Sequence, residues 1–398
     1  MAKTKRDPLI VSVVRTAIGD FGGSLRDASH TDLARVVMGE VLGRVRFPPE
    51  EIDDIFWGTV MVRSDENSFA RTAGLRAGIP EKVHAVQVNR ACCSSMETIR
   101  MGSLAIRLGE ADAILAGGGE SMSNVSYSIK NARWGLRLRH QELSDGVWDG
   151  LFDQYSGLIM GMTAENVAER YGISRQEQDE FAFASQMRAK KALETGRFKD
   201  EIVPVVFPGK RGKPDRVVDV DEHPRPETTL EELSKLPPAF KEGGTVTAGN
   251  SSGLNDGASA ALIVSRELAD RLNLTRRWKI VGSVAVGVDP AMMGIGPIPA
   301  TRKLLQKTGH KIEDMDLIEV NEAFAAPYLA VERELRLNRD IVNVNGGGIA
   351  LGHPIGNTGC RLVVTLIHEM EKRGLNRGLA TLCGGGGVGQ AIIVERTE

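Results

Sequence analysis

VQVNRACCSSMETI (residues 86–99) and VNVNGGGIALGHPIGNTGCRLVVTLI (residues 342–367) are two versions of one pattern, and their repetition decides the fold. Both contain a Val-Asn turn with small residues, and both continue into a segment with helical spacing. Each is preceded by a strand-like run and followed by a strand that ends in glycines. The flanking runs are EEIDDIFWGTV (50–60) and IEDMDLIEVNEAF (312–324) before, and DAILAGGGE (112–120) and LATLCGGGGVG (379–389) after. Because the order of parts is the same twice, we predict a tandem duplication.

Short β-rich runs alternate with helical periods along both halves, which indicates an α/β fold. Pro299 is expected near the start of one helix and Gly309 just past its end. Gly374 follows two basic residues that are expected to close the next long helix. The β-rich runs lie at residues 9–14, 113–116, 341–344 and 380–383.

The pattern changes between the two halves. Amphipathic segments such as AENVAERYGISRQEQDEFAFASQMRAKKALETG are followed there by Pro-rich and charged stretches. This composition is typical of an inserted domain rather than of a third copy of the repeat. We therefore predict an N-terminal half over residues 1–120, an inserted domain over residues 121–250 and a C-terminal half over residues 251–398.

Composition excludes several classes of function. The 398 residues are 41% hydrophobic and 26% charged, with a formal net charge of −2, so no overall field recruits nucleic acid or an anionic membrane. No run approaches the roughly 18 apolar residues of a membrane span, and the charged N-terminus lacks a secretory pattern. We expect a cytoplasmic protein. The four cysteines lack the spacing of a zinc site and are expected to be free thiols, with no metal bound.

Cys92 stands at the expected start of a helix. Ser94 and Glu97 have the spacing of a capping box, which would begin the helix just after the thiol. The positive end of the helix dipole would then favour a thiolate nucleophile. An inert, packed cysteine is an equal alternative on this pattern alone. The side chain of the neighbouring Cys93 is expected to point elsewhere.

His353 and Cys383 lie in the glycine-rich segments of the second half. Glycines around His353 permit a close approach of ligand that bulkier residues would forbid, although a single histidine is more often structural. Cys383 ends an apolar strand and precedes GGGGVG, whose backbone N–H groups can stabilise an oxyanion. That run also fits a dinucleotide-binding glycine pattern. We reject this interpretation because only nine residues follow Gly389, too few for the rest of such a site.

Five motifs follow one another along the chain: VNRACCSSM (88–96), GTVTAGNSSGLNDGASA (244–260), NEAFA (321–325), GGGIALGHPIGNTG (346–359) and CGGGGVG (383–389). In this order they resemble the thiolase family over nearly the whole chain, particularly its bacterial acetyl-CoA acetyltransferase branch. The resemblance implies two halves stacked as a five-layer αβαβα sandwich, with the insertion forming a loop domain over coenzyme A. This agrees with the duplication read from the repeats.

The resemblance also implies roles for particular residues. Cys92 would be the nucleophile, His353 its activating base, and Cys383 the group that exchanges a proton with the acetyl α-carbon. Asn321 would orient a water that joins His353 in one oxyanion hole. The backbone N–H groups of Cys92 and Gly385 would form the other.

Contacts to coenzyme A follow from the same resemblance. Ser252 would lie near the pantetheine and Arg225 near the adenosine end, although serine in such a loop is more often a turn residue. Met160, Met293 and Phe324 match positions around the acyl end of the site, although methionine is by default a core filler.

Three positions depart from the family pattern. Cys93 and Ser95 stand where thiolases usually have glycine, and Ile159 stands where short-chain enzymes typically carry histidine. We favour a short 3-ketoacyl-CoA substrate, with a longer or unusual acyl chain as the alternative.

The resemblance implies a thiolase that cleaves 3-ketoacyl-CoA or condenses two acetyl-CoA through a ping-pong acyl-enzyme. Coenzyme A thioesters would be its substrates, without another cofactor, and a homodimer or homotetramer would be its assembly. A ketoacyl synthase of the same fold is one rival, disfavoured by Cys383. A noncatalytic acyl-CoA-binding partner in a complex is another, disfavoured by the four polar residues Cys92, Asn321, His353 and Cys383.

Overall fold

The computed structural model describes residues 4–138, 140–209, 212–275 and 277–397. In this part of the chain an 11-stranded sheet runs through the molecule in the order β15-β16-β17-β14-β1-β13-β5-β3-β4, with β10 added beside β1 and β2 beside β13. Its strands are β1 (Pro8–Thr16), β2 (Gly19–Asp20), β3 (Asp54–Gly58), β4 (His84–Val88), β5 (Ala113–Ser121), β10 (Ile202–Val203), β13 (Asn255–Ser265), β14 (Trp278–Gly287), β15 (Leu317–Val320), β16 (Arg377–Gly384) and β17 (Val388–Arg396).

The sheet consists of two halves with the same strand pattern. In the N-terminal half β13 is antiparallel to both β1 and β5, and β5 is parallel to β3. In the C-terminal half β17 is antiparallel to both β14 and β16, and β16 is parallel to β15. The halves join through the short pairing of Leu9 and Ile10 in β1 with Lys279 and Trp278 in β14. The topology therefore repeats as the sequence predicts.

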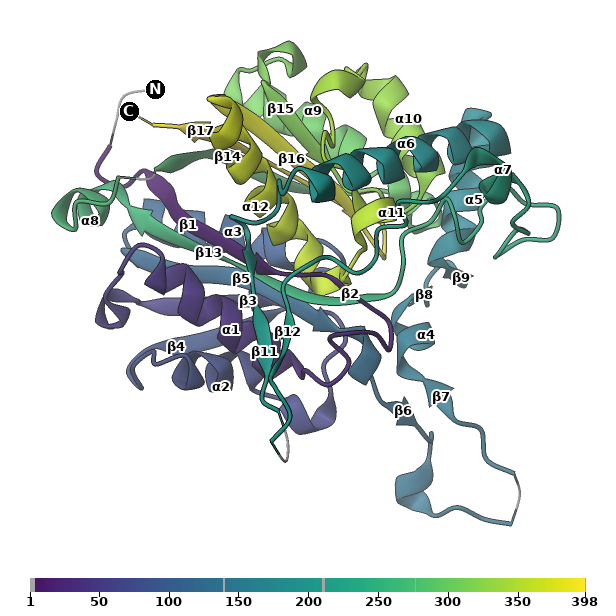
Figure 1. Cartoon of the computed structure of the whole chain (residues 1–398), viewed down its shortest axis with the longest axis horizontal. Coiled ribbons are helices and arrows are strands. Elements are labelled where there is room, and N and C mark those ends of the chain that lie inside the picture. The colour runs from purple at the N-terminus through teal and green to yellow at the C-terminus, as the bar shows by residue number, and fades with distance from the viewer. Residues whose placement is uncertain (1–3, 139, 210–211, 276, 398) are drawn as a thin grey trace.

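Helices separate and cover the two halves, as Figure 1 shows. The helices α3 (Ser94–Leu108) and α12 (Ile355–Arg373) pack together between the half-sheets and share one apolar core with strands of both. A second core lies under α1 (His30–Gly43) and α2 (Phe69–Arg76) on the N-terminal half. A third lies under α9 (Pro297–Thr308) and α10 (Ala325–Leu335) on the C-terminal half. This αβαβα layering confirms the predicted fold.

The position of α12 explains its sequence. Every residue of this helix from Ile355 to Met370 is buried, because layers of protein surround it on all sides. Its C-terminus is closed by Gly374 at φ 68°, and α9 is closed by Gly309 at φ 72°. Both glycines adopt the left-handed conformation expected at a helix end, as the sequence predicts. No helix in the described residues is long and apolar enough to cross a membrane.

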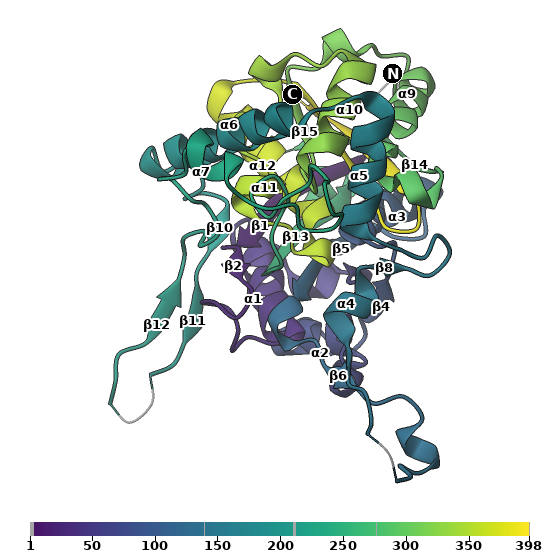
Figure 2. The same ribbon diagram turned by 90° about the vertical axis from the view of Figure 1, so that its right-hand side faces the viewer.

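The segment between β5 and β13 packs on the layered body in part, through β10, α5 and α6, and extends away from it in part. Figure 2 shows two thin extensions, one carrying β6 and the other β11 and β12. Strand β13 lies in the N-terminal half of the sheet although it follows residue 251, where we place the start of the C-terminal half. The elements of this segment are β6 (Tyr127–Ser128), β7 (Ser144–Asp145), α4 (Gly146–Gly150), β8 (Phe152–Asp153), β9 (Leu158–Ile159), α5 (Met160–Tyr171), α6 (Arg175–Glu194), β11 (Val205–Phe207), β12 (Arg216–Val218) and α7 (Leu230–Ser234).

Short turns complete the described chain. The remaining α-helices are α8 (Arg266–Arg271) and α11 (Gly348–Leu351). The 3₁₀ turns are η1 (Pro49–Glu51), η2 (Ser64–Glu66), η3 (Met122–Asn124), η4 (Ala132–Trp134), η5 (Pro290–Ile295), η6 (Ile312–Asp314) and η7 (Arg339–Ile341).

Candidate active site

A cavity of about 490 Å³ opens where the N-terminal ends of α3 and α12 meet the end of β16. Its wall includes Cys92, His353 and Cys383, so three side chains far apart in the sequence converge on one space. Most of the remaining wall is apolar. Of the other residues predicted for the site, the wall includes Met160, Arg225, Ser252, Met293 and Phe324.

The turn that carries Cys92 is fixed by its own backbone. Ala91 adopts φ +47°, a left-handed conformation that a residue other than glycine adopts only at a cost. The N–H of Cys93 then donates to the carbonyl of Arg90 at 3.1 Å, and that of Ser94 to the carbonyl of Ala91 at 3.0 Å. Helix α3 begins immediately afterwards, so Cys92 lies just before its first turn.

The predicted capping box is wrong. The N-cap of α3 is Cys93, which makes no side-chain cap. Ser94 instead donates its hydroxyl to the carbonyl of Ala91 at 2.6 Å and accepts the N–H of Arg90 at 2.9 Å. Glu97 is buried, and its carboxylate pairs with Arg90 at 3.2 Å and Arg100 at 2.6 Å. A buried carboxylate gains more from two guanidinium partners than from a backbone N–H, because its charge must be compensated.

The predicted thiolate at the helix start is also wrong for the resting protein. Burial raises the pKa of the half-buried Cys92 thiol to about 11, although the N–H of Gly385 donates to its sulfur and opposes this shift. Burial, reinforced by the neighbouring Cys92, raises the pKa of Cys383 to about 12. Both thiols are therefore protonated at neutral pH, and Cys92 needs a base before it can attack.

Alkylation of Cys92 by iodoacetamide should therefore accelerate as pH rises. Since only the thiolate reacts, the rate should increase about tenfold per pH unit from neutral pH and level off near pH 11. Peptide mass spectrometry of the labelled protein across pH 6 to 11 measures the rate at Cys92. A rate that is already level at pH 7 would instead restore the helix-dipole prediction.

His353 is held as a neutral base. Its Nδ1 lies 2.6 Å from Thr358 Oγ1, and this hydroxyl donates its own hydrogen to the carbonyl of Pro354 at 2.9 Å. Thr358 can then only accept, so the hydrogen-bond network assigns the imidazole hydrogen to Nδ1 and leaves a lone pair on Nε2. Burial, reinforced by the charge of Arg361, lowers the pKa of His353 to about 3. The free ring is therefore uncharged at neutral pH.

Asn321 and Gly385 lie beside the groups they are predicted to assist. Asn321 follows β15, and its Nδ2 lies 3.4 Å from Nε2 of His353. Gly385 directs its N–H at the sulfur of Cys92, and a Cβ at this position would lie 3.3 Å from Sδ of Met160. Neither residue is part of the cavity wall, but each contacts a residue that is. Their chemical roles stay predictions.

The residues that depart from the family pattern have distinct locations. Ile159 lies in the cavity wall, next to Met160. Cys93 is buried outside the wall, with its sulfur 3.9 Å from the carbonyl of Leu382. Ser95 joins the two central helices, because its hydroxyl donates to the carbonyl of Asn357 at 2.9 Å and accepts the N–H of Cys360 at 2.9 Å.

Sequence reasoning missed several residues of the site. Thr358 orients the ring of His353 through Nδ1, and Asn255 holds its backbone, because the Asn255 side-chain oxygen accepts the backbone N–H of His353 at 2.8 Å. Thr358 could have been found from the sequence, because it follows His353 by five residues and lies in the first turn of the helix that comes next. His223 lies in the wall and pairs with Asp20, although its segment has the composition of an exposed loop. The local sequence around His223 could not reveal this pairing, because Asp20 lies in β2, 203 positions earlier, and is placed by the pairing of β2 with β13.

Comparison with known proteins gives two family matches. The model described as "Thiolase, N-terminal domain" matches residues 9–267, and "Thiolase, C-terminal domain" matches residues 274–396. An acetyl-CoA acetyltransferase of Syntrophomonas wolfei is 49% identical over 98% of this chain and 99% of its own length.

Solved structures agree with these matches. The crystal structure of a Bacillus anthracis acetyl-CoA acetyltransferase superposes with a TM-score of 0.96 at 47% identity, covering 98% of this chain and 99% of that one. Human mitochondrial 3-ketoacyl-CoA thiolase in complex with CoA superposes with a TM-score of 0.93 at 44% identity, covering 99% and 98%. Matches of this extent in sequence and fold show that the chain belongs to the thiolase family.

Proposed function

We propose that this chain transfers acyl groups between coenzyme A thioesters by a ping-pong mechanism. It would cleave a short 3-ketoacyl-CoA with coenzyme A and, in reverse, condense two acetyl-CoA to acetoacetyl-CoA. The observation that carries the proposal is that the thiols of Cys92 and Cys383 and the imidazole of His353 line one cavity. The thiolase reaction needs one nucleophile, one base and one separate proton donor.

The first half-reaction uses all three groups. The Cys92 sulfur attacks C3 of the 3-ketoacyl chain while Nε2 of His353 accepts its proton. The C2–C3 bond then breaks, and its electron pair leaves with acetyl-CoA as an enolate. The Cys383 thiol donates a proton to the enolate carbon, giving acetyl-CoA and a Cys383 thiolate. The remaining acyl group is a thioester on Cys92.

The second half-reaction restores each group. The Cys383 thiolate takes the proton from a new coenzyme A thiol, whose sulfur attacks the acyl carbon on Cys92. The Cys92 sulfur leaves and recovers its proton from the His353 imidazolium. The elevated pKa of Cys383 suits it to proton transfer to and from the α-carbon, because a thiol that holds its proton at rest is a strong base once deprotonated.

Two sets of donors would stabilise the transient oxyanions. The N–H of Gly385 already points at the Cys92 sulfur, so an acyl oxygen on that sulfur would lie near it. The amide of Asn321 lies beside Nε2 of His353. Donors fixed in advance stabilise charge that appears only in the transition state.

Coenzyme A is the proposed partner of the rest of the cavity. Arg225 is an exposed cation in the wall, suited to a phosphate or adenosine end, while Ser252 is fixed through its N–H to the carbonyl of Ala323 at 2.9 Å. Met293 and Phe324 pack with Cys383 in one apolar cluster beside the proposed acyl chain. Apolar Ile159 in the wall favours a longer or branched acyl group as the second candidate substrate.

Turnover of acetoacetyl-CoA with coenzyme A tests the proposal. Loss of the enolate absorbance is expected with wild type and not with Cys92→Ala as the matched control. A series of 3-ketoacyl-CoA substrates of increasing length then decides between the short and longer chains. Absence of turnover at every length would favour a noncatalytic acyl-CoA-binding role. We further propose that the protein is cytoplasmic and forms a homodimer or homotetramer. Light scattering of the purified protein measures the molar mass of the assembly.

Replacement of Thr358 by valine should slow the reaction without weakening binding. Valine keeps the shape of threonine but removes the acceptor for Nδ1–H of His353, so the ring loses its fixed tautomer and orientation. We expect kcat to fall roughly 10–100-fold with little change in KM. Steady-state kinetics measure both. Thr358→Ser retains the hydroxyl and should stay near wild type, and equal losses in the two variants would contradict the role.

A further inference from the structure

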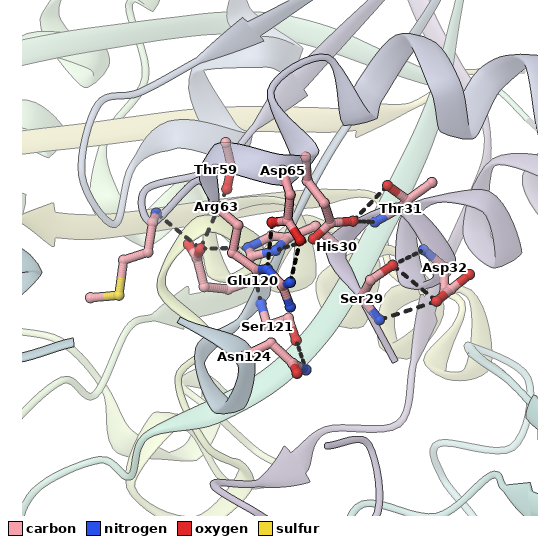
Figure 3. A network of polar contacts seen from close by, with 12 residues as sticks. Ser29, His30, Thr31, Asp32, Thr59, Arg63, Asp65, Glu120, Ser121 and Asn124 are labelled. Atoms are coloured by element: carbon pink, nitrogen blue, oxygen red, sulfur yellow. Dashed lines mark hydrogen bonds and ion pairs between the residues drawn. The ribbon is translucent and has the colours of Figure 1, made fainter. Parts of the chain in front are cut away.

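The carboxylate of Glu120 in β5 is completely buried and accepts five hydrogen bonds. Figure 3 shows it at the centre of a polar network, with the His30 ring against it. Oε1 lies 3.1 Å from Nε2 of His30 and accepts the N–H of Met61 at 3.0 Å and the hydroxyl of Thr59 at 3.4 Å. Oε2 accepts the N–H of Val60 at 3.0 Å and that of Gly356 at 3.0 Å.

One group of these donors belongs to the segment that supports the Cys92 turn. The N–H of Thr59 donates to the carbonyl of Val88 at 3.0 Å, at the end of the strand that leads into the turn. Asn89, inside the turn, donates its side-chain amide to the carbonyl of Val60 at 3.2 Å. The hydroxyl oxygen of Ser94, the first residue of α3, lies 3.5 Å from the carbonyl oxygen of Thr59. Glu120 therefore fixes the loop against which the nucleophile is placed.

The remaining backbone donor belongs to the segment that carries His353. Gly356 is three residues after the imidazole, in the first turn of α12. A Cβ at this position would lie 2.6 Å from Oε2 of Glu120 and 2.8 Å from Cα of Thr59, so only glycine allows this approach. A single carboxylate thus joins the supports of the nucleophile and of the base, which come from the two halves of the fold.

The charge of Glu120 is balanced by His30. Burial opposes a charged imidazole there, but the hydrogen bond to Glu120 and the nearby carboxylate of Glu66 outweigh it and raise the pKa of His30 to about 9. The ring lies 3.1 Å from Glu120 and 3.4 Å from Glu66. A buried carboxylate that lacked this counter-charge would be costly. The negative charge of Glu120 also helps to keep the proton on Cys92, since it contributes to the raised pKa of that thiol.

We propose that Glu120 is a positioning residue of the thiolase reaction that sets the placement of Cys92 relative to His353. The inference rests on the proposed function. Glu120 does not line the cavity and acts through the backbone N–H groups of Val60, Met61 and Gly356. Its loss should impair the chemical step more than substrate binding.

Glu120→Gln, Glu120→Asp and the control Glu66→Gln test the proposal. Glutamine turns one acceptor into a donor, which then faces N–H groups, and it removes the charge. Aspartate keeps the charge but is too short to reach both loops. Glu66 contacts His30 and Thr31 in the same network but no segment that carries Cys92 or His353.

We expect kcat with acetoacetyl-CoA to fall roughly 10–100-fold in both Glu120 variants, with KM within about twofold of wild type. Glu66→Gln should retain kcat within about twofold. The pH profile of Cys92 alkylation should move to lower pH in Glu120→Gln, because a nearby negative charge is lost, and stay in place in Glu120→Asp. If Glu120 were needed only for folding, the folded variants would show neither a selective loss of kcat nor a shift in the pH profile of Cys92 alkylation.

Several results would overturn the proposal. These are a wild-type kcat in either folded Glu120 variant, a loss confined to KM, an equal loss in Glu66→Gln, or the failure of both Glu120 variants to fold. Should Glu120→Gln alone fail to fold, Glu120→Asp decides by its kcat. An inactive wild type would instead refute the proposed function, so the two failures are distinguishable.

Discussion

Cys92→Ala should abolish acyl transfer and acyl-enzyme formation together. Removal of the nucleophile leaves no group to accept the acyl chain, and the loss in kcat should reach roughly 10⁴-fold or more. Incubation with acetyl-CoA followed by intact-protein mass spectrometry should show an added acetyl group on wild type and none on the variant. The adjacent Cys93 is a poor substitute, because it is buried outside the cavity wall.

Cys93→Ala is the matched control for this experiment. Cys93 is the next residue in the sequence after Cys92, yet its side chain is buried against the carbonyl of Leu382 and does not line the cavity. The variant should therefore still form the acyl-enzyme. An unchanged acetyl stoichiometry in Cys92→Ala would refute the assignment of Cys92 as the nucleophile. Loss of labelling in a folded Cys93→Ala would indicate that Cys93 carries the acyl group instead.

Cys383→Ala should separate the two halves of the chemistry. Acylation of Cys92 by a simple acyl-CoA requires only the nucleophile and His353, so it should continue slowly. Cleavage and condensation need a proton moved to or from the α-carbon, and general acid–base catalysis of such a step contributes typically 10²–10⁴-fold. We expect a loss of that size in overall turnover, measured by acetoacetyl-CoA cleavage alongside acetyl labelling.

Exchange of the acetyl-CoA methyl hydrogens with deuterated water tests Cys383 directly. Wild type should catalyse the exchange, and Cys383→Ala should not. Cys360→Ala provides a control, because that thiol is buried in the core between α3 and α12 and lies outside the cavity. Rapid exchange in Cys383→Ala would assign the α-proton to another base.

Local sequence patterns succeeded where one segment fixes its own structure. The glycines that end α9 and α12 are examples, since a helix end needs a left-handed residue and only neighbouring atoms decide it. The capping box at Ser94 and Glu97 failed for the opposite reason. Glu97 accepts a hydrogen bond from Gln390 at 3.0 Å and is paired with arginines, and such a buried charge follows its partners rather than the local pattern.

The sequence by itself determined the duplicated order of strands and helices and the identity of the residues that converge on the cavity. The duplication follows from the repeated order of segments, and the site residues follow from the motifs and their resemblance to the thiolase family. Only the tertiary structure decided the protonation states of Cys92, Cys383 and His353, and the link that Glu120 makes between the two halves. Desolvation depends on the packing of the whole fold, and the hydrogen bond from Gly356 to Glu120 joins residues 236 positions apart, so no local pattern records either.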